Sequence, residues 1–145
     1  MARKTWIEKF RVDRQPEVKR TEKPFADIPE NSLMLIATPQ LVADYIREIP
    51  PGTFVDTPTI RRDLALTHGA DHTCPVTTGI FLRIVAEAAF EEMLSGKPLE
   101  EITPFWRAIA PGSPTAKKLT FGQELIQQQR AKEQDEIEHD ASDAH

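Results

Sequence analysis

Three side chains that could support metal or nucleophilic chemistry lie within seven positions: His68, His72 and Cys74. Imidazole and thiolate are common zinc ligands, but Asp71 is the only near candidate for a further ligand. A thiol beside a histidine can also act as a nucleophile, and Cys74 precedes Pro75 at a predicted helix start, a position that favours a reactive thiolate. The spacing matches no standard metal module. We therefore predict no metal, and a structural cysteine is the favoured interpretation.

The segment Pro104-Phe105-Trp106-Arg107 is the best candidate for a binding pocket. Aromatic rings can stack on a planar group, and an arginine can hold an anion beside it. In the competing interpretation, Phe105 and Trp106 fill the core and Arg107 hydrogen-bonds the end of a helix, because aromatic residues are more often core than pocket. Both interpretations stay open from the sequence.

Several hydroxyl and basic side chains could contact phosphates. Thr77 and Thr78 stand at the start of the strongest predicted helix, where capping would explain them equally well. Arg83 follows on the same helix as its only cation before an acidic end. Lys117 and Lys118 form a basic pair, for which exposure to solvent is the commoner outcome.

The charge of the chain is unevenly distributed. The 145 residues carry a formal net charge of −5, which on its own argues against a nucleic-acid-binding protein. Residues 1–23, however, hold eight basic and four acidic groups, whereas residues 131–145 hold one lysine and six acidic groups. Within residues 101–130, four basic groups face two acidic ones. The net charge therefore does not exclude DNA, and it predicts weak, salt-sensitive binding.

Composition limits the class of protein. With 39% hydrophobic and 28% charged residues, the chain is typical of one globular domain. A single cysteine rules out an intrachain disulfide and fits a reducing compartment. The sequence contains no apolar run long enough to cross a membrane, and residues 1–10 are too charged for a signal peptide. We therefore expect a cytoplasmic protein that does not bind membranes.

The predicted elements are mostly helical. Residues 33–37 form an apolar run typical of a buried strand, and Thr-Pro pairs at 38–39 and 57–58 predict the starts of two short helices. Residues 77–94 predict the longest helix, and residues 99–109 predict an extended segment around a turn. A last helix is predicted after the Pro-Gly-Ser-Pro segment that follows.

This order of elements predicts a mostly α (α+β) single domain with short strands. Two short helices, a longer helix and a β-like wing are the plan of a winged helix-turn-helix. We expect this domain over residues 31–130, an N-terminal arm over residues 1–30, and an acidic disordered tail over residues 131–145.

Three segments between residues 49 and 130 follow the motifs of one protein family. Ile49-Pro50-Pro51-Gly52, followed by Ile60, is similar to Ile-Pro-x-Gly-x-Val-x-Thr-Tyr-Gly-x-Ile. Residues 102–109, Ile-Thr-Pro-Phe-Trp-Arg-Ala-Ile, look like an active-site segment Ile-Pro-Cys-His-Arg-Val. Residues 113–130 are similar to an ending Gly-x-Leu…Gly-Gly-x-x-x-Lys-x-x-Leu-Leu. The chain thus resembles the DNA-binding domain of the O6-alkylguanine-DNA alkyltransferases.

The departures from the family motifs concern its chemistry. At the alkyl-accepting Cys and its neighbouring His, this chain has Phe105 and Trp106, which can neither accept an alkyl group nor move a proton. Alkyl transfer at this position is therefore excluded, so the resemblance is closest to the non-enzymatic alkyltransferase-like branch, although that branch usually keeps the His. The family's phosphate-rotating Tyr falls on Thr57, and its intercalating Arg falls on Gly79.

The resemblance implies a non-enzymatic DNA-binding protein without a cofactor. Its expected partner is double-stranded DNA, and repair proteins are a further expectation, whereas sensing of alkylated guanine is left open. The side chains implied as DNA contacts are Thr57, Thr77, Thr78, Arg83, Lys117 and Lys118, and those implied as a base pocket are Pro104, Phe105, Trp106 and Arg107.

Two alternatives come from other functional classes. One is a thiol-dependent enzyme or sensor that uses Cys74 with His68 or His72. The other is a protein-interaction module whose fold has lost DNA binding.

Overall fold

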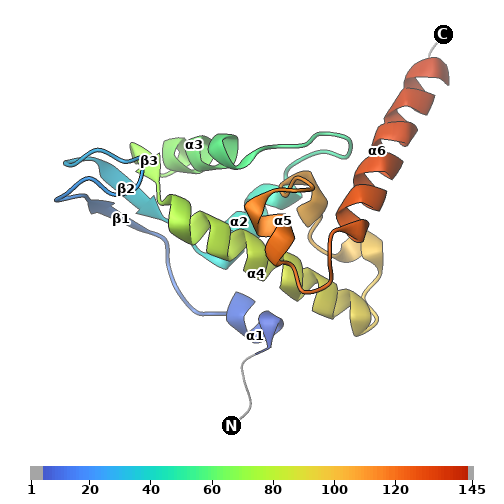
Figure 1. Cartoon of the computed structure of the whole chain (residues 1–145), viewed down its shortest axis with the longest axis horizontal. Helices are drawn as coiled ribbons and strands as arrows, with labels where there is room; N and C mark the ends of the chain where they lie inside the picture. Colours follow the sequence, from blue (N-terminus) through green and yellow to red (C-terminus); the bar gives the residue numbers. More distant parts are fainter. Residues whose placement is uncertain (1–4, 144–145) are drawn as a thin grey trace.

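A long apolar helix, α4 (Pro75–Leu94), runs through the centre of the fold (Figure 1). The computed structural model describes residues 5–143, and it describes side chains for residues 5–138. The other elements, in chain order, are α1 (Trp6–Phe10), β1 (Glu17–Arg20), β2 (Leu33–Ile36), α2 (Pro39–Arg47), α3 (Thr57–Thr67), β3 (His72–Thr73), the 3₁₀ turns η1 (Leu99–Glu101) and η2 (Phe105–Arg107), α5 (Pro114–Lys118) and α6 (Glu124–Asp143). The fold is mixed α+β, as predicted.

Helix α4 is central because it is apolar on most of its surface. Leu82, Val85, Ala86 and Ala89 are buried on it, and it packs against α1, α2, α3, α5 and η2. A helix that is apolar on nearly all sides must be covered by neighbours. The rest of the core comes from β2, α2, α3, α6 and the segment around η2, with the large buried side chains Leu35, Val42, Ile46, Ile60, Phe105, Ile109 and Ile126.

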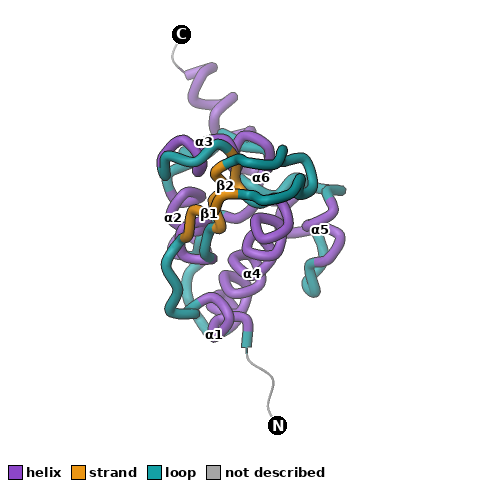
Figure 2. Tube along the Cα trace, turned by 90° about the vertical axis from the view of Figure 1, so that its left-hand side faces the viewer, coloured by secondary structure: helices purple, strands orange, loops and turns teal. Residues whose placement is uncertain are grey.

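A three-stranded sheet lies on one side of the molecule, next to the start of α4 (Figure 2). β1 pairs antiparallel with β2, and β2 pairs parallel with β3 in the order β1-β2-β3. The amides of Asp71 and Cys74 donate to the carbonyl oxygens of Leu33 and Leu35, both at 2.8 Å. The sheet therefore determines where α4 begins.

The predicted start of α2 is confirmed. The Thr38 hydroxyl accepts the Leu41 amide at 3.1 Å, and Pro39 occupies the first helical position. The start of α3 differs by one residue, since Asp56 rather than Thr57 is the N-cap and accepts the Thr59 amide at 2.9 Å. A carboxylate is an equally good cap, which is why the two residues could not be distinguished from the sequence.

The segment 99–109 differs from its prediction. It contains the turns η1 and η2 instead of extended strands, and the sheet is built from residues outside it. The single predicted last helix is two helices, α5 and α6, because Leu119 leaves α5 in an extended conformation.

Both predicted terminal segments are more structured than expected. β1 of the predicted arm pairs with β2, and Ile28 is buried. Residues 131–143, predicted to be disordered, continue helix α6, since the Glu133 carboxylate is hydrogen-bonded to the domain and Ile137 contacts Gly52. The end of α6 projects from the body (Figure 1). Residues 1–4 and 144–145 lie outside the described residues.

Candidate functional site

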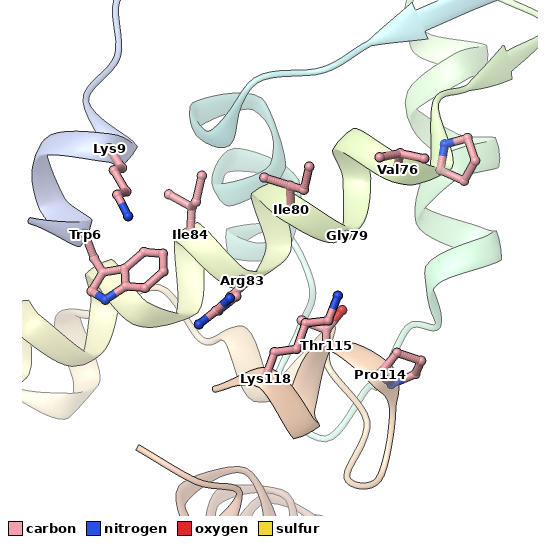
Figure 3. Close-up of a pocket in the computed structure, with 11 residues that line it drawn as sticks. Trp6, Lys9, Val76, Gly79, Ile80, Arg83, Ile84, Pro114, Thr115 and Lys118 are labelled. Carbon is pink, nitrogen blue, oxygen red and sulfur yellow. The ribbon is translucent and has the colours of Figure 1, made fainter. Parts of the chain in front are cut away.

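A cavity of about 670 Å³ opens between α1, the first half of α4 and α5 (Figure 3). One apolar wall is formed by Val76, Ile80 and Ile84, which are spaced four residues apart and so lie along one face of α4. Val76 and Ile80 are 54% and 50% exposed, so the wall is open to solvent. An uncovered apolar wall in a cavity of this size is typical of a binding site.

Three basic side chains from three different elements line the same cavity. They are Lys9 of α1, Arg83 of α4 and Lys118 of α5. Among the described residues that line this cavity, none is acidic. Apolar walls reduce the local dielectric constant and concentrate the field of these cations. The cavity is therefore suited to an anionic ligand.

Trp6 holds two of the cations in place. Lys9 Nζ lies 4.1 Å and Arg83 Cζ lies 5.0 Å from the centroid of the Trp6 ring, within the range of cation–π attraction. The Trp6 amide donates to Glu91 Oε1 at 2.6 Å, which fixes α1 on α4. A capping box at Thr5 starts the short helix. The capping box and the long-range hydrogen bond to Glu91 together bring Lys9 to the cavity.

Arg83 is unusual because its Nε is buried and donates no hydrogen bond to any residue that the structure describes. The nearest carboxylate is Glu87, with Oε2 at 3.6 Å, but this carboxylate accepts the Thr120 hydroxyl at 2.6 Å and the Thr120 amide at 3.1 Å. Glu87 thus anchors the turn that follows α5. The Arg83 side chain is 33% exposed, so its guanidinium can also meet a ligand.

Helix α5 supplies the third side of the cavity. The Ser113 hydroxyl accepts the Ala116 amide at 3.2 Å, and Pro114 occupies the first helical position. Thr115 and Lys118 line the cavity, whereas Lys117 is exposed and does not line it. Of the predicted phosphate contacts, the cavity therefore brings together only Arg83 and Lys118.

The three threonines predicted as DNA contacts lie elsewhere. Thr78 does not fit this role, because its side chain is fully buried and its hydroxyl donates to the Cys74 carbonyl at 2.7 Å. Thr77 is half-buried on the first turn of α4. Thr57 lines a smaller cavity of about 200 Å³ beside the Asp56 carboxylate. The Thr59 hydrogen bonds hold the pKa of Asp56 below its usual range, so this cavity carries a negative charge.

The four residues of the predicted base pocket are together, but three of them are buried. Phe105 is 0% and Trp106 is 4% exposed, and their rings meet edge to face at 5.4 Å. Pro104 is also buried. Arg107 Nη1 donates to the carbonyl oxygen of Ile49, just beyond the end of α2, at 2.9 Å. The structure thus shows the competing interpretation, in which the aromatic residues are core.

A buried carboxylate completes this cluster. Glu133 of α6 accepts the Trp106 indole Nε1 at 2.5 Å, the Arg107 Nε at 3.1 Å and the Gly52 amide at 2.8 Å. Burial alone would raise the pKa of Glu133, but the hydrogen bonds from Arg107, Trp106 and Gly52 outweigh it and keep the pKa below its ordinary value. The adjacent cleft of about 320 Å³ is also lined by Glu100 and by a further carboxylate of α6. It is therefore unsuited to an anion.

The candidate thiol site has no assembled partner group. Cys74 is 4% exposed at the N-cap of α4. His68 Nδ1 lies 3.1 Å from the Leu64 carbonyl oxygen, and His72 pairs with Met34 in the sheet. Among the described residues, no group of three or more His, Cys, Asp or Glu side chains is placed to hold a metal ion.

Known proteins provide no identification of this site. No family model, no curated protein and no solved structure matches the chain. None of the helices that the structure describes is long and apolar enough to cross a membrane. The function must therefore be argued from the geometry of the cavity.

Sequence reasoning gave no site role to the apolar wall of α4, and it also missed Trp6 and Lys9. The signal that could have found them is the basic N-terminal segment with its aromatic residues on one helical face. This pattern does not indicate on which surface of the domain the N-terminal segment packs.

Proposed function

We propose that the chain is a non-enzymatic DNA-binding protein that contacts DNA phosphates through the basic residues of the α1–α4–α5 cavity. The observation that carries the proposal is the convergence of Lys9, Arg83 and Lys118 on one cavity that is open to solvent. Phosphates supply most of the affinity of proteins for DNA, and Lys and Arg are their usual partners.

The order of helices supports the same surface. α2 and α3 are short, and α4 is longer and packs against both, which fits the place of a recognition helix after two short helices. Within a winged-helix arrangement, the first half of α4 would face the DNA, and Val76 and Ile80 would be near the groove. The motif resemblance to the alkyltransferase DNA-binding domain favours this assignment.

The proposal excludes alkyl transfer at the family's acceptor position. The side chains that stand there are Phe105 and Trp106, which offer no nucleophile and no proton-transferring group. Arg107 beside them is already bonded to Glu133.

The test is the salt dependence of binding to a short duplex, followed by fluorescence anisotropy. Three phosphate contacts give a slope of log K against log salt of about −2.7, so affinity should fall about 40-fold between 50 and 200 mM salt. The variants Lys9→Ala, Arg83→Gln and Lys118→Ala should each reduce this slope by about 0.9.

Lys132→Ala is the matched control, since Lys132 is an exposed lysine on α6 outside the cavity. It should leave the slope unchanged. Wild-type slopes in all three cavity variants would place DNA binding elsewhere, and no binding even at low salt would favour the protein-interaction alternative. A duplex with one O6-methylguanine tests lesion sensing, for which tighter binding than to the unmodified duplex is expected.

A further inference from the structure

We infer that the α1–α4–α5 cavity accepts one unpaired nucleotide, with the base against the apolar wall and the phosphate between the cations. This inference rests on the proposed function, because it names what enters the surface that is proposed to bind DNA. It places the base beside Ile80 and Ile84 of α4. The buried Pro104–Arg107 cluster takes no part in it.

The chemistry of the wall favours a base that has left the stack. Val76, Ile80 and Ile84 have no side-chain hydrogen-bond donor or acceptor, so they cannot read the polar edge of a paired base. They can, however, cover the apolar face of a base. In a duplex these faces are stacked on their neighbours, whereas in a single strand or at a gap they are accessible.

The positions of the charged groups favour a nucleotide over a longer apolar ligand. Figure 3 shows Trp6 at one end of the wall and Pro114 near the other, with Arg83 between them. The volume of about 670 Å³ suits a ligand of a few rings, and three cations are among the residues that line it. A nucleoside phosphate is of this size and combines one planar base with one anionic phosphate.

Gly79 offers a way to fill the cavity without changing its charge. It lies on α4 and lines the cavity, and a Cβ built on it meets no atom within 4 Å. A larger side chain at this position therefore enters open space, and replacing a helical glycine also favours the helix. Gly79→Leu should occupy part of the cavity beside the apolar wall, and Gly79→Ala is the matched control, which removes the glycine but takes up little space.

The experiment compares the full-length wild type, Gly79→Ala and Gly79→Leu with four probes at equal salt. The probes are a thymidine oligonucleotide of about eight nucleotides, a duplex of the same length, free thymidine monophosphate, and an acidic peptide with leucine residues. Because Trp106 is 4% exposed, a change in tryptophan emission on binding reports Trp6.

The wild type should bind the single strand about 10-fold more tightly than the duplex, and the single strand should change the Trp6 emission. Gly79→Leu should weaken single-strand binding until this preference is lost, and Gly79→Ala should behave as the wild type. Weak binding of free thymidine monophosphate at the same site supports the inference, and the single strand should bind more tightly than this free nucleotide.

Three results would overturn the inference. They are equal affinity of the wild type for single strand and duplex, a single-strand affinity that Gly79→Leu leaves unchanged, and tighter binding of the acidic peptide than of the strand. If Gly79→Leu fails to fold, the strand preference and the emission change of the wild type decide. If the wild type binds the single strand but not the duplex, only the proposed duplex contact is contradicted. The two proposals can therefore fail separately.

Discussion

Removal of the Glu133 carboxylate should strongly destabilise the fold. This carboxylate accepts hydrogen bonds from Trp106, Arg107 and Gly52, which come from parts of the chain far apart in sequence. Glu133→Ala leaves Arg107 as a largely buried cation without its carboxylate. It also leaves the indole and the Gly52 amide without an acceptor.

The cost follows from the burial of the pair. Breaking a buried ion pair by removing one partner costs roughly 3–5 kcal/mol. The side chains of Arg107 and Glu133 are 14% and 8% exposed, and Arg107 keeps its bond to the Ile49 carbonyl, so the lower limit applies. We expect a loss of about 3 kcal/mol, which corresponds to a fall in Tm of about 9 °C at about 3 °C per kcal/mol for a chain of this size.

The same carboxylate makes stability depend on pH. Its pKa in the folded state is below the ordinary value of 4.5, so the unfolded state binds the proton more readily. The stabilisation is fully present above this ordinary value and is lost as the pH falls through the lower folded-state pKa. The difference in unfolding free energy between wild type and Glu133→Gln should therefore be constant near neutral pH and shrink as the solution is acidified below 4.5.

Urea unfolding followed by circular dichroism measures both effects. Glu136→Gln is the control, because Glu136 is an exposed carboxylate one turn further along α6 and lines the same cleft. It should change the unfolding free energy by less than about 0.5 kcal/mol. A loss below about 1 kcal/mol for Glu133→Ala, or a difference between Glu133→Gln and wild type that does not shrink in acid, would refute the reasoning.

Two further predictions concern other contacts. Gly52→Ala should cost at least about 1 kcal/mol in urea unfolding, because Gly52 has a φ of +84° and its new Cβ would overlap the Cδ1 atom of Ile137. Ile137→Ala in the same chain should recover part of this cost but not the backbone part, and full recovery would contradict the backbone argument. Glu87→Gln should tighten duplex binding several-fold at low salt, since it removes the negative charge 3.6 Å from Arg83, and unchanged affinity would show that Arg83 takes no part.

Local signals in the sequence predicted the helices well. Thr38 and Pro39 are adjacent in sequence and together determine where α2 starts. This start can therefore be predicted without knowledge of any distant contact. The strand β1 had no such signal. Its sequence Glu-Val-Lys-Arg has no apolar face, and its pairing with β2 depends on residues about fifteen positions away.

The prediction for residues 131–143 was wrong for a related reason. Their composition is too polar to bury a large surface, which is typical of disorder. A single carboxylate, Glu133, anchors the segment, and its three donors lie between 26 and 81 positions away in sequence. Composition cannot reveal a contact of that kind.

The candidate site was predicted in part, again according to how local its parts are. Arg83 stood out because it interrupts an apolar helix, and Lys118 because it forms a basic pair with Lys117. Trp6 and Lys9 reach the cavity only because Glu91 binds the amide of Trp6. For Phe105 and Trp106 the sequence allowed pocket or core, and burial against Phe121 and Glu133 decides for core.

The net charge of −5 is compatible with a cationic cavity because the carboxylates are not evenly placed. The acidic end of α6 projects from the body in the direction opposite to α1 (Figure 1), and charges farther apart than about 8 Å are largely screened at physiological salt. Glu91 is bound to the Trp6 amide at the α1 end. Among the side chains that the structure describes, Glu87 is the one carboxylate paired with a cavity cation, at 3.6 Å from Arg83, where salt screens little. Under the proposed function, local geometry governs phosphate binding more than total charge does, and Glu87 is then the group expected to weaken it.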